Sequence, residues 1–231
     1  MPPQGPKYLM LYSTTDGHTK TIMDAIAKQL FEEAQAQCDV VDIRDGNSYA
    51  LSDYQKVLIG ASIRYGSFSS AFLSYVKQHE AELNTMPSAF FGVNLTARKK
   101  EKNTPMTNAY TRKFLTRSTW FPQLTGVFAG ALWYPRYNFV DRIMVQLVMR
   151  MTGGETDPAK EIVFTDWAVV RKFASDFAAL PLTVPPRPKP APAATSAGFL
   201  PNRTGVRLVL LIAGASVAAL LGRRLIAARR K

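Results

Sequence analysis

Short apolar runs and amphipathic segments alternate along residues 7–180, and this alternation limits the fold class. In residues 19–34, for example, Ile22, Ile26 and Leu30 recur at helical spacing. Strands that alternate with helices form a parallel sheet covered by helices on both faces. We therefore predict an α/β domain with a doubly wound, five-stranded parallel sheet. The predicted strands are 8–12, 38–43, 56–62, 88–94 and 125–131, with 161–165 as a continuation of the fifth, and the predicted helices are 19–34, 68–83, 107–116 and 167–180.

The composition excludes several kinds of site. The chain of 231 residues has one cysteine, Cys38, which excludes a disulfide framework and any site built from several cysteines. Two histidines, His18 and His79, do not make a histidine-rich metal centre, so we predict no metal. The length allows one α/β domain of ordinary size and an appendage.

The appendage follows residue 180. Residues 181–204 are a proline-rich linker, which can form neither a helix nor a sheet ladder and predicts a semi-rigid spacer. Residues 208–222 carry no charge and would span roughly 22 Å as a helix, less than the ~30 Å hydrocarbon core of a bilayer. Flanking arginines can snorkel and extend that span. We expect a single transmembrane helix over 205–228, with an interfacial helix or a short buried helix as alternatives.

The net charge of +12 is unevenly distributed. Nine basic residues and no acidic residue follow residue 180, so most of the excess borders the expected anchor. A nucleic-acid-binding domain would gather this charge on a folded face with exposed aromatic side chains. We therefore expect no nucleic acid as a partner.

A loop rich in hydroxyl groups follows the first predicted strand and leads directly into a helix. The free N–H groups and the dipole of a helix N-terminus favour a phosphate. The loop lacks the lysine of a P-loop and the three glycines of a dinucleotide fingerprint. An ordinary N-cap, the alternative, needs one such residue and not four. We predict a monophosphate site at Ser13, Thr14, Thr15, Asp16, Gly17, His18 and Thr19.

The loops after the third and fourth strands reach the same edge of the sheet. In the loop after the third strand, small residues let a planar ligand approach the backbone. Tyr65 in this loop could stack on the ligand, and Arg64 could meet a negative charge on it. In the fourth, the backbone of residues 93–97 could border a ring. Three such loops at one edge are the arrangement of a flavin mononucleotide (FMN) site.

With these loops the chain resembles the flavodoxin family, and within it the quinone-dependent protoporphyrinogen oxidases of flavodoxin fold. The similarity covers about 7–180 and does not extend to the linker and the apolar tail. The strings that carry it are IGASIRYG (59–66), MPSAF (86–90), VNLTARKKEKNTP (93–105), AGALWYPRY (129–137), GGETD (153–157) and TDW (165–167).

The resemblance implies an enzyme of haem biosynthesis. It would oxidise protoporphyrinogen IX to protoporphyrin IX by six electrons, with FMN as cofactor and a membrane quinone as acceptor. The flavin phosphate would lie on the 13–19 loop, and no residue stands out as a catalytic base. The other FMN contacts that it implies are Ser62, Ile63, Arg64, Tyr65, Gly66, Phe90, Val93, Asn94, Leu95, Thr96, Ala97, Gly153, Gly154 and Thr156.

Two basic segments are candidates for contact with substrate or lipid. Residues 135–151 combine an apolar face with arginines, which suits a membrane surface or an apolar substrate with carboxylates, although core packing explains the same pattern. We expect 133–154 to be an insertion in the fifth strand. Arg98, Lys99, Lys100 and Arg136 could bind the propionates, or could belong to solvated loops.

Two other functions stay open, a membrane-tethered flavodoxin electron carrier and an NAD(P)H:quinone reductase. Carriers usually present an acidic face, whereas residues 95–150 are basic, and the chain has no second nucleotide fingerprint. With a tail anchor, we expect the protein at a mitochondrial membrane in a eukaryote, or at the cytoplasmic face of the inner membrane in a bacterium. The sequence indicates no oligomeric state.

Overall fold

The computed structural model describes residues 5–151 and 153–184. The predicted anchor over 205–228 and the linker from residue 185 onward lie outside the described residues. Among the described residues, no helix is both long and apolar enough to span a bilayer.

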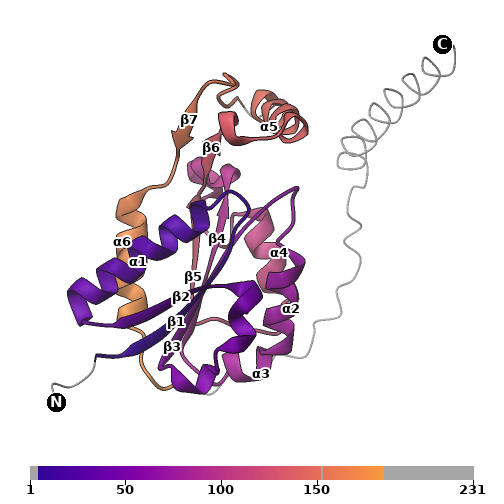
Figure 1. The fold of residues 1–231 in the computed structure, drawn as a ribbon. Helices are drawn as coiled ribbons and strands as arrows, with labels where there is room; N and C mark the ends of the chain where they lie inside the picture. Colours follow the sequence, from indigo (N-terminus) through magenta and orange to yellow (C-terminus); the bar gives the residue numbers. More distant parts are fainter. Residues whose placement is uncertain (1–4, 152, 185–231) are drawn as a thin grey trace, which may run out of the picture. The chain divides into compact units, whose positions relative to one another are not determined.

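Five parallel strands form the central sheet in the order β2-β1-β3-β4-β5, which confirms the predicted α/β fold (Figure 1). β3 and β4 are buried almost throughout, as strands with helices on both faces must be. The strand order reverses at β1, so the loops after β1 and β3 border one crevice at the carboxyl edge. The strands are β1 (Lys7–Ser13), β2 (Gln37–Asp42), β3 (Lys56–Ser62), β4 (Ser88–Asn94) and β5 (Leu124–Ala129).

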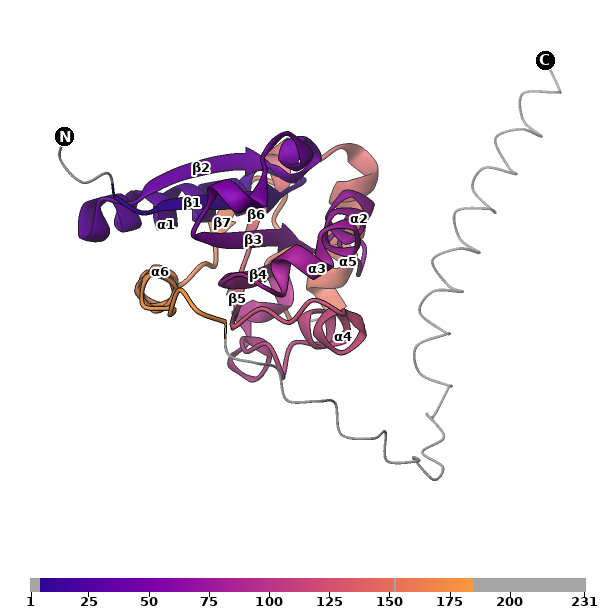
Figure 2. The same cartoon turned by 90° about the horizontal axis from the view of Figure 1, so that it is seen from below.

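Helices cover the two faces of the sheet (Figures 1 and 2). α1 (His18–Ala34) and α6 (Trp167–Ala178) pack together over one face, where Ile22 and Phe173 belong to the same core cluster. The other face is covered by α2 (Ser70–Gln78), α3 (Glu80–Leu83) and α4 (Ala109–Arg117). Short 3-10 helices complete this layer and its loops: η1 (Ile43–Ser48), η2 (Leu51–Asp53), η3 (Leu95–Arg98) and η4 (Lys100–Lys102).

The predicted helix over 68–83 is divided in two at His79. The backbone of His79 leaves the helical region, with φ −104° and ψ 13°. Its ring lies 4.4 Å from that of Tyr75, and its Nε2 lies 2.8 Å from Asn47 Oδ1. These contacts hold the residue at the junction between α2 and α3.

After β5 the chain builds a separate layer beyond the carboxyl edge of the sheet (Figure 1). The layer consists of β6 (Ala131–Trp133), η5 (Tyr134–Arg136), α5 (Phe139–Met151) and β7 (Glu161–Val163). The prediction that 161–165 continues the fifth strand is wrong, because β7 pairs antiparallel with β6 in a second sheet. The segment that leaves the central sheet therefore begins at β6, two residues before the predicted start of the insertion at residue 133, and it extends past the predicted end at residue 154.

α5 has two apolar faces with different surroundings. Val145 and Met149 pack on Leu132 and Tyr134 in a small core of their own. Core packing thus accounts for one face only. The other face exposes Phe139, Val140, Ile143, Leu147 and Val148.

Candidate functional site

The loop after β1 forms a cradle for an anion at the start of α1. Gly17 precedes the helix with φ 84° and ψ −19°, the left-handed conformation that glycine adopts without strain. Within the described chain no side chain caps this helix, and its first turn holds no acidic residue. The first N–H groups of α1 are therefore available to a ligand.

One buried hydroxyl in the cradle lacks a partner. Thr19 is 1% exposed, and its Oγ1 forms no hydrogen bond with any described residue. Burying an unpaired hydroxyl costs free energy. Thr14 Oγ1 accepts a hydrogen bond of 3.0 Å from the Gly17 N–H and so keeps its own hydrogen for donation. Two hydroxyl donors and free N–H groups at one helix start fit the phosphate of FMN.

The other predicted residues of the cradle have different roles. Ser13 Oγ lies 2.7 Å from Ser69 Oγ, which ties the loop to the N-cap of α2. Thr15 is exposed on the loop surface. Asp16 turns toward Arg64 rather than toward the helix start.

His18 anchors the cradle from behind. Its Nε2 lies 2.6 Å from Thr165 Oγ1, and Thr165 donates its own hydrogen to the Ala129 carbonyl at 2.7 Å. His18 Nε2 must therefore be the donor to Thr165. Burial lowers the pKa of His18. The His18 ring is turned to Thr165 and lies against Trp133 and Trp167, so the predicted phosphate contact of His18 would use its backbone N–H and stays a prediction.

This buried imidazole predicts a pH-dependent stability. Its folded-state pKa lies below the ordinary value of 6.5, so the unfolded chain binds the proton more readily. The free energy of unfolding should be highest above pH 6.5 and should fall by up to about 1 kcal/mol as the pH drops one unit below it. Urea unfolding of the flavin-free protein at several pH values measures this. His18→Gln should lose this contribution and His79→Gln should keep it; an unchanged slope in His18→Gln would contradict the assignment.

The loop after β3 is a tight turn with an aromatic tip. Arg64 and Ser67 exchange two backbone hydrogen bonds of 3.0 Å, and between them Tyr65 and Gly66 have φ values of 50° and 78°. Two such residues in succession form the turn type of two-residue hairpins. Tyr65 is 69% exposed, but its hydroxyl donates to Asp141 and the Arg64 guanidinium lies 5.4 Å from its ring centroid, so its predicted stacking on a planar ligand stays a prediction.

Arg64 bridges the cradle to α5. Its two terminal nitrogens lie 2.8 Å from Asp16 Oδ2 and 2.5 Å from Asp141 Oδ2. The hydrogen bond from the Tyr65 hydroxyl is the main cause that lowers the pKa of Asp141, and Arg64 contributes. Burial raises the pKa of Asp16, and Arg64 opposes that rise. The prediction that Arg64 meets a ligand charge is thus modified, because two carboxylates already occupy its guanidinium.

The loop after β4 is held in place by Asn94. Its Oδ1 accepts hydrogen bonds from Ala97 N at 3.1 Å, Thr96 Oγ1 at 2.6 Å and Asn108 Nδ2 at 3.0 Å. Its own Nδ2 is buried and has no partner among the described residues.

A backbone hydrogen bond joins this edge to the previous loop. Ile63 N donates to Val93 O at 2.9 Å. Ser62 Oγ in turn donates to Ser13 O at 3.4 Å. Of the predicted ring contacts, Ser62–Gly66 and 93–97, including Leu95, are therefore brought together at the same edge as the cradle.

Phe90 does not join them. It lies in the middle of β4, paired in register with Ile59, and is fully buried. Its ring packs 5.4 Å from that of Phe72 and 4.9 Å from that of Phe114. The predicted flavin contact of Phe90 is wrong, because this position faces the aromatic core and not the carboxyl edge.

Gly153, Gly154 and Thr156 belong to the end of α5. Gly154 N donates to Met149 O at 2.7 Å, and a Cβ at Gly154 would lie 2.3 Å from Met149 Cε. The Thr156 carbonyl accepts from Gln146 Nε2 at 2.9 Å. In the structure these three residues belong to the segment that leads the chain from α5 back to β7. Their predicted contact with FMN stays a prediction.

The predicted propionate ligands are scattered, and two are already engaged. Arg136 forms a bidentate ion pair with Glu161, at 2.9 and 3.2 Å, and lies over the ring of Trp133. Arg98 donates to the Leu95 carbonyl at 2.9 Å. Lys99, half-buried, lies between η3 and η4, and Lys100, exposed, begins η4.

Sequence reasoning missed the residues that hold the site from a distance. Thr165, Ser69, Asp141 and Asn108 each contact a predicted site residue. Ser69 and Asn108 were detectable as N-caps of α2 and α4. Nothing in the local sequence indicates which loop they reach.

Comparisons with known proteins identify the family of this chain. A family model described as flavodoxin domain matches residues 9–159. Over 230 residues and 100% of both chains, the protein is 66% identical to protoporphyrinogen IX dehydrogenase (quinone) of Leishmania major, so the similarity includes the region after residue 180. It is 51% identical over 174 residues to the protein of the same name from Escherichia coli K12, covering 75% of this chain and 96% of the relative.

A solved structure, flavodoxin 1 from Bacillus cereus, has 17% sequence identity and a TM-score of 0.42, and covers 74% of this chain and 97% of its own. The family match and the two curated relatives decide the assignment. This chain belongs to the flavodoxin-domain family, among the members named protoporphyrinogen IX dehydrogenase (quinone).

Proposed function

We propose that this protein oxidises protoporphyrinogen IX to protoporphyrin IX, with FMN as cofactor and a quinone as electron acceptor. The observation that carries the proposal is the 66% identity with a relative of that name over the whole of both chains. The cradle at Thr14 and Thr19, with its unpaired donors, supports the binding of FMN.

The chain itself binds and orients. FMN, when bound, would supply the redox chemistry, the transfer of electrons from the porphyrinogen to the quinone. Loop 13–19 holds the phosphate through the first N–H groups of α1 and the hydroxyls of Thr14 and Thr19. The joined loops 62–66 and 93–97 border the ring, and Arg64 offsets one of the two negative charges that Asp16 and Asp141 place beside the cradle. Overall, the porphyrinogen gives up six electrons and six protons, which three quinone molecules take up.

The acceptor implies an approach to lipid, since a membrane quinone is dissolved in the bilayer. The outer face of α5 exposes five large apolar side chains, and Arg150 at its end is also exposed. An apolar helix face with basic residues suits the interface of a membrane. We propose that this face and the expected anchor over 205–228 attach the protein, to a mitochondrial membrane in a eukaryote or to the cytoplasmic face of the inner membrane in a bacterium.

An oxidation assay tests the function. Purified full-length protein should contain FMN and should turn protoporphyrinogen IX into fluorescent porphyrin only when a quinone is added. A flavin-loaded protein that oxidises no porphyrinogen with any quinone would refute the proposal. Electron exchange with a reductase would then favour a membrane-tethered flavodoxin electron carrier. Reduction of quinone by NAD(P)H would instead favour an NAD(P)H:quinone reductase.

Fractionation tests the membrane attachment. Truncation after Leu180 removes the expected anchor and should weaken membrane binding, with FMN still bound. If the truncated protein stays with membranes, adding Ile143→Asp and Leu147→Asp on α5 should release it, because both side chains are exposed on its apolar face. Membrane binding that survives all these changes would contradict both attachments.

A further inference from the structure

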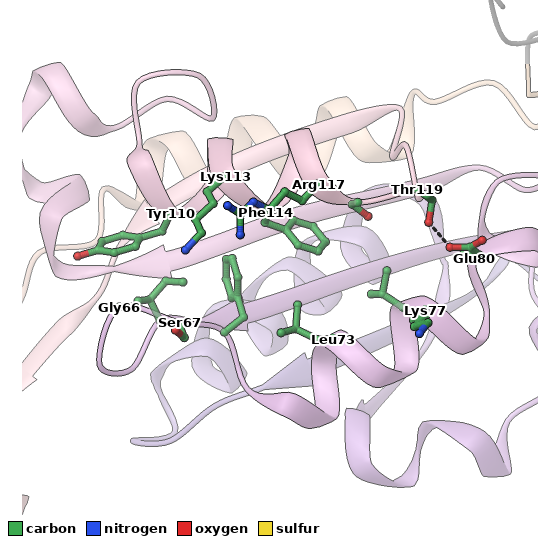
Figure 3. Close-up of a pocket in the computed structure, with 14 residues that line it drawn as sticks. Gly66, Ser67, Leu73, Lys77, Glu80, Tyr110, Lys113, Phe114, Arg117 and Thr119 are labelled. Atoms are coloured by element: carbon green, nitrogen blue, oxygen red, sulfur yellow. Dashed lines mark hydrogen bonds between the residues drawn. The ribbon is translucent and has the colours of Figure 1, made fainter. Parts of the chain in front are cut away.

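A groove of about 610 Å³ lies between α2 and α4, apart from the phosphate cradle (Figure 3). Ligand pockets in proteins usually fall between about 300 and 1,000 Å³. Gly66 and Ser67 lie at one end of the groove, and Glu80 and Thr119 at the other. The first end therefore belongs to the turn that carries Tyr65, one of the loops predicted to border the flavin ring.

The groove is lined by apolar side chains from three elements. Phe68 and Phe114 are buried members of the aromatic core, with ring centroids 5.5 Å apart. Ile63, from the turn, and Val76, from α2, also line it. Leu73 on α2 is 45% exposed although it lines this concave surface. Such a surface favours an apolar ligand.

Three cations border this apolar surface. Lys113 and Arg117 lie one turn apart on α4, and Lys77 lies across from them on α2 (Figure 3). Within residues 5–151 and 153–184, none of the three forms an ion pair, whereas Arg64 and Arg136 are both paired. The acid of the groove, Glu80, accepts a hydrogen bond from the Thr119 hydroxyl at the far end.

We propose that this groove binds the porphyrinogen, with the tetrapyrrole on the apolar lining and the two propionates on Lys113 and Arg117. This inference rests on the proposed function and names the substrate site for it. A neutral quinone could use the apolar lining but has no group for unpaired cations, whereas a dicarboxylic tetrapyrrole uses both. In this proposal Lys113 and Arg117 bind the propionates in place of Arg98 and Arg136, which were predicted for that role but have other partners.

Porphyrin binding to the FMN-loaded full-length protein tests the proposal. The probes are protoporphyrin IX and its uncharged dimethyl ester, followed by porphyrin fluorescence anisotropy. Wild type should bind the diacid at least tenfold more tightly than the diester. The double variant Lys113→Glu/Arg117→Glu should weaken diacid binding at least tenfold and leave diester binding within twofold. Arg171→Glu/Lys172→Glu on α6 makes the same charge change on the opposite face of the sheet and should change neither.

Steady-state kinetics separate this proposal from the function itself. In Lys113→Glu/Arg117→Glu the KM for protoporphyrinogen should rise at least tenfold, with the quinone KM and the FMN content unchanged. Unchanged diacid binding and kinetics in an active, flavin-loaded double variant would overturn the groove and leave the function intact. A wild type that binds the diacid in a Lys113- and Arg117-dependent way but oxidises no porphyrinogen would refute the function and support the groove as a site for apolar dicarboxylates.

Discussion

Thr19→Val should weaken FMN binding about 30-fold, because a hydrogen bond to a charged group is worth roughly 1.5–3 kcal/mol. The flavin-free variant should be at least as stable as the wild type, since the hydroxyl that it loses is buried without a partner among the described residues. Valine has nearly the same shape as threonine. Flavin fluorescence quenching gives the Kd, and urea unfolding gives the stability.

Thr21→Val is the matched control. Thr21 is exposed on the same helix, two residues further on, and should leave both the Kd for FMN and the stability unchanged. If Thr19→Val binds FMN as the wild type does, the Thr19 hydroxyl does not meet the phosphate. If it lowers the stability of the flavin-free protein, the hydroxyl has a partner in the native state and the cradle must be reinterpreted.

Arg64→Met should weaken FMN binding about tenfold, because the negative charge of Asp16 and Asp141 is then no longer offset next to the flavin phosphate. Without the guanidinium, Asp16 and Asp141 lose their shared cation beside a site that binds a phosphate. The Asp16→Asn/Arg64→Met variant should recover much of the lost affinity, because the net charge beside the phosphate, now from Asp141 alone, equals that of the wild type. Titration at low and high salt should show the loss shrinking as salt increases.

Arg44→Met is the control for a surface ion pair. The Arg44 side chain is 75% exposed where it pairs with Asp42, and such pairs contribute little. It should not change the affinity for FMN. An Arg64→Met variant with wild-type affinity, or a double variant weaker than the single one, would show that Arg64 does not neutralise Asp16 at this site.

The sheet was largely predictable from the sequence. β3 and β4 occupy the predicted residues 56–62 and 88–94, because central strands of a parallel sheet read as continuous apolar runs. The division of the helix at His79 was not predictable, since it depends on contact with Asn47, 32 positions away. Antiparallel pairing of β7 with β6 was missed for the same reason.

The candidate site divides in the same way. The cradle is a local motif of strand, loop and helix start, so residues 13–19 indicated it directly. The partners of its side chains are remote: His18 contacts Thr165 at a separation of 147 positions, and Arg64 contacts Asp141 at 77. Phe90 was assigned to the flavin because it precedes the right loop, but the side chain faces the aromatic core.

The sequence by itself determined the order of strands and helices and the family resemblance, and it predicted where the phosphate cradle lies. All three depend on residue types within short segments, where hydrophobic period and turn chemistry decide the local structure. Only the tertiary structure decided which polar groups already have partners, namely Arg64, Arg136 and His18. It also decided which groups are left for a ligand: Thr19 in the cradle, and Lys113 and Arg117 in the groove between α2 and α4. Those partners come from segments far apart in the chain, and packing brings them together.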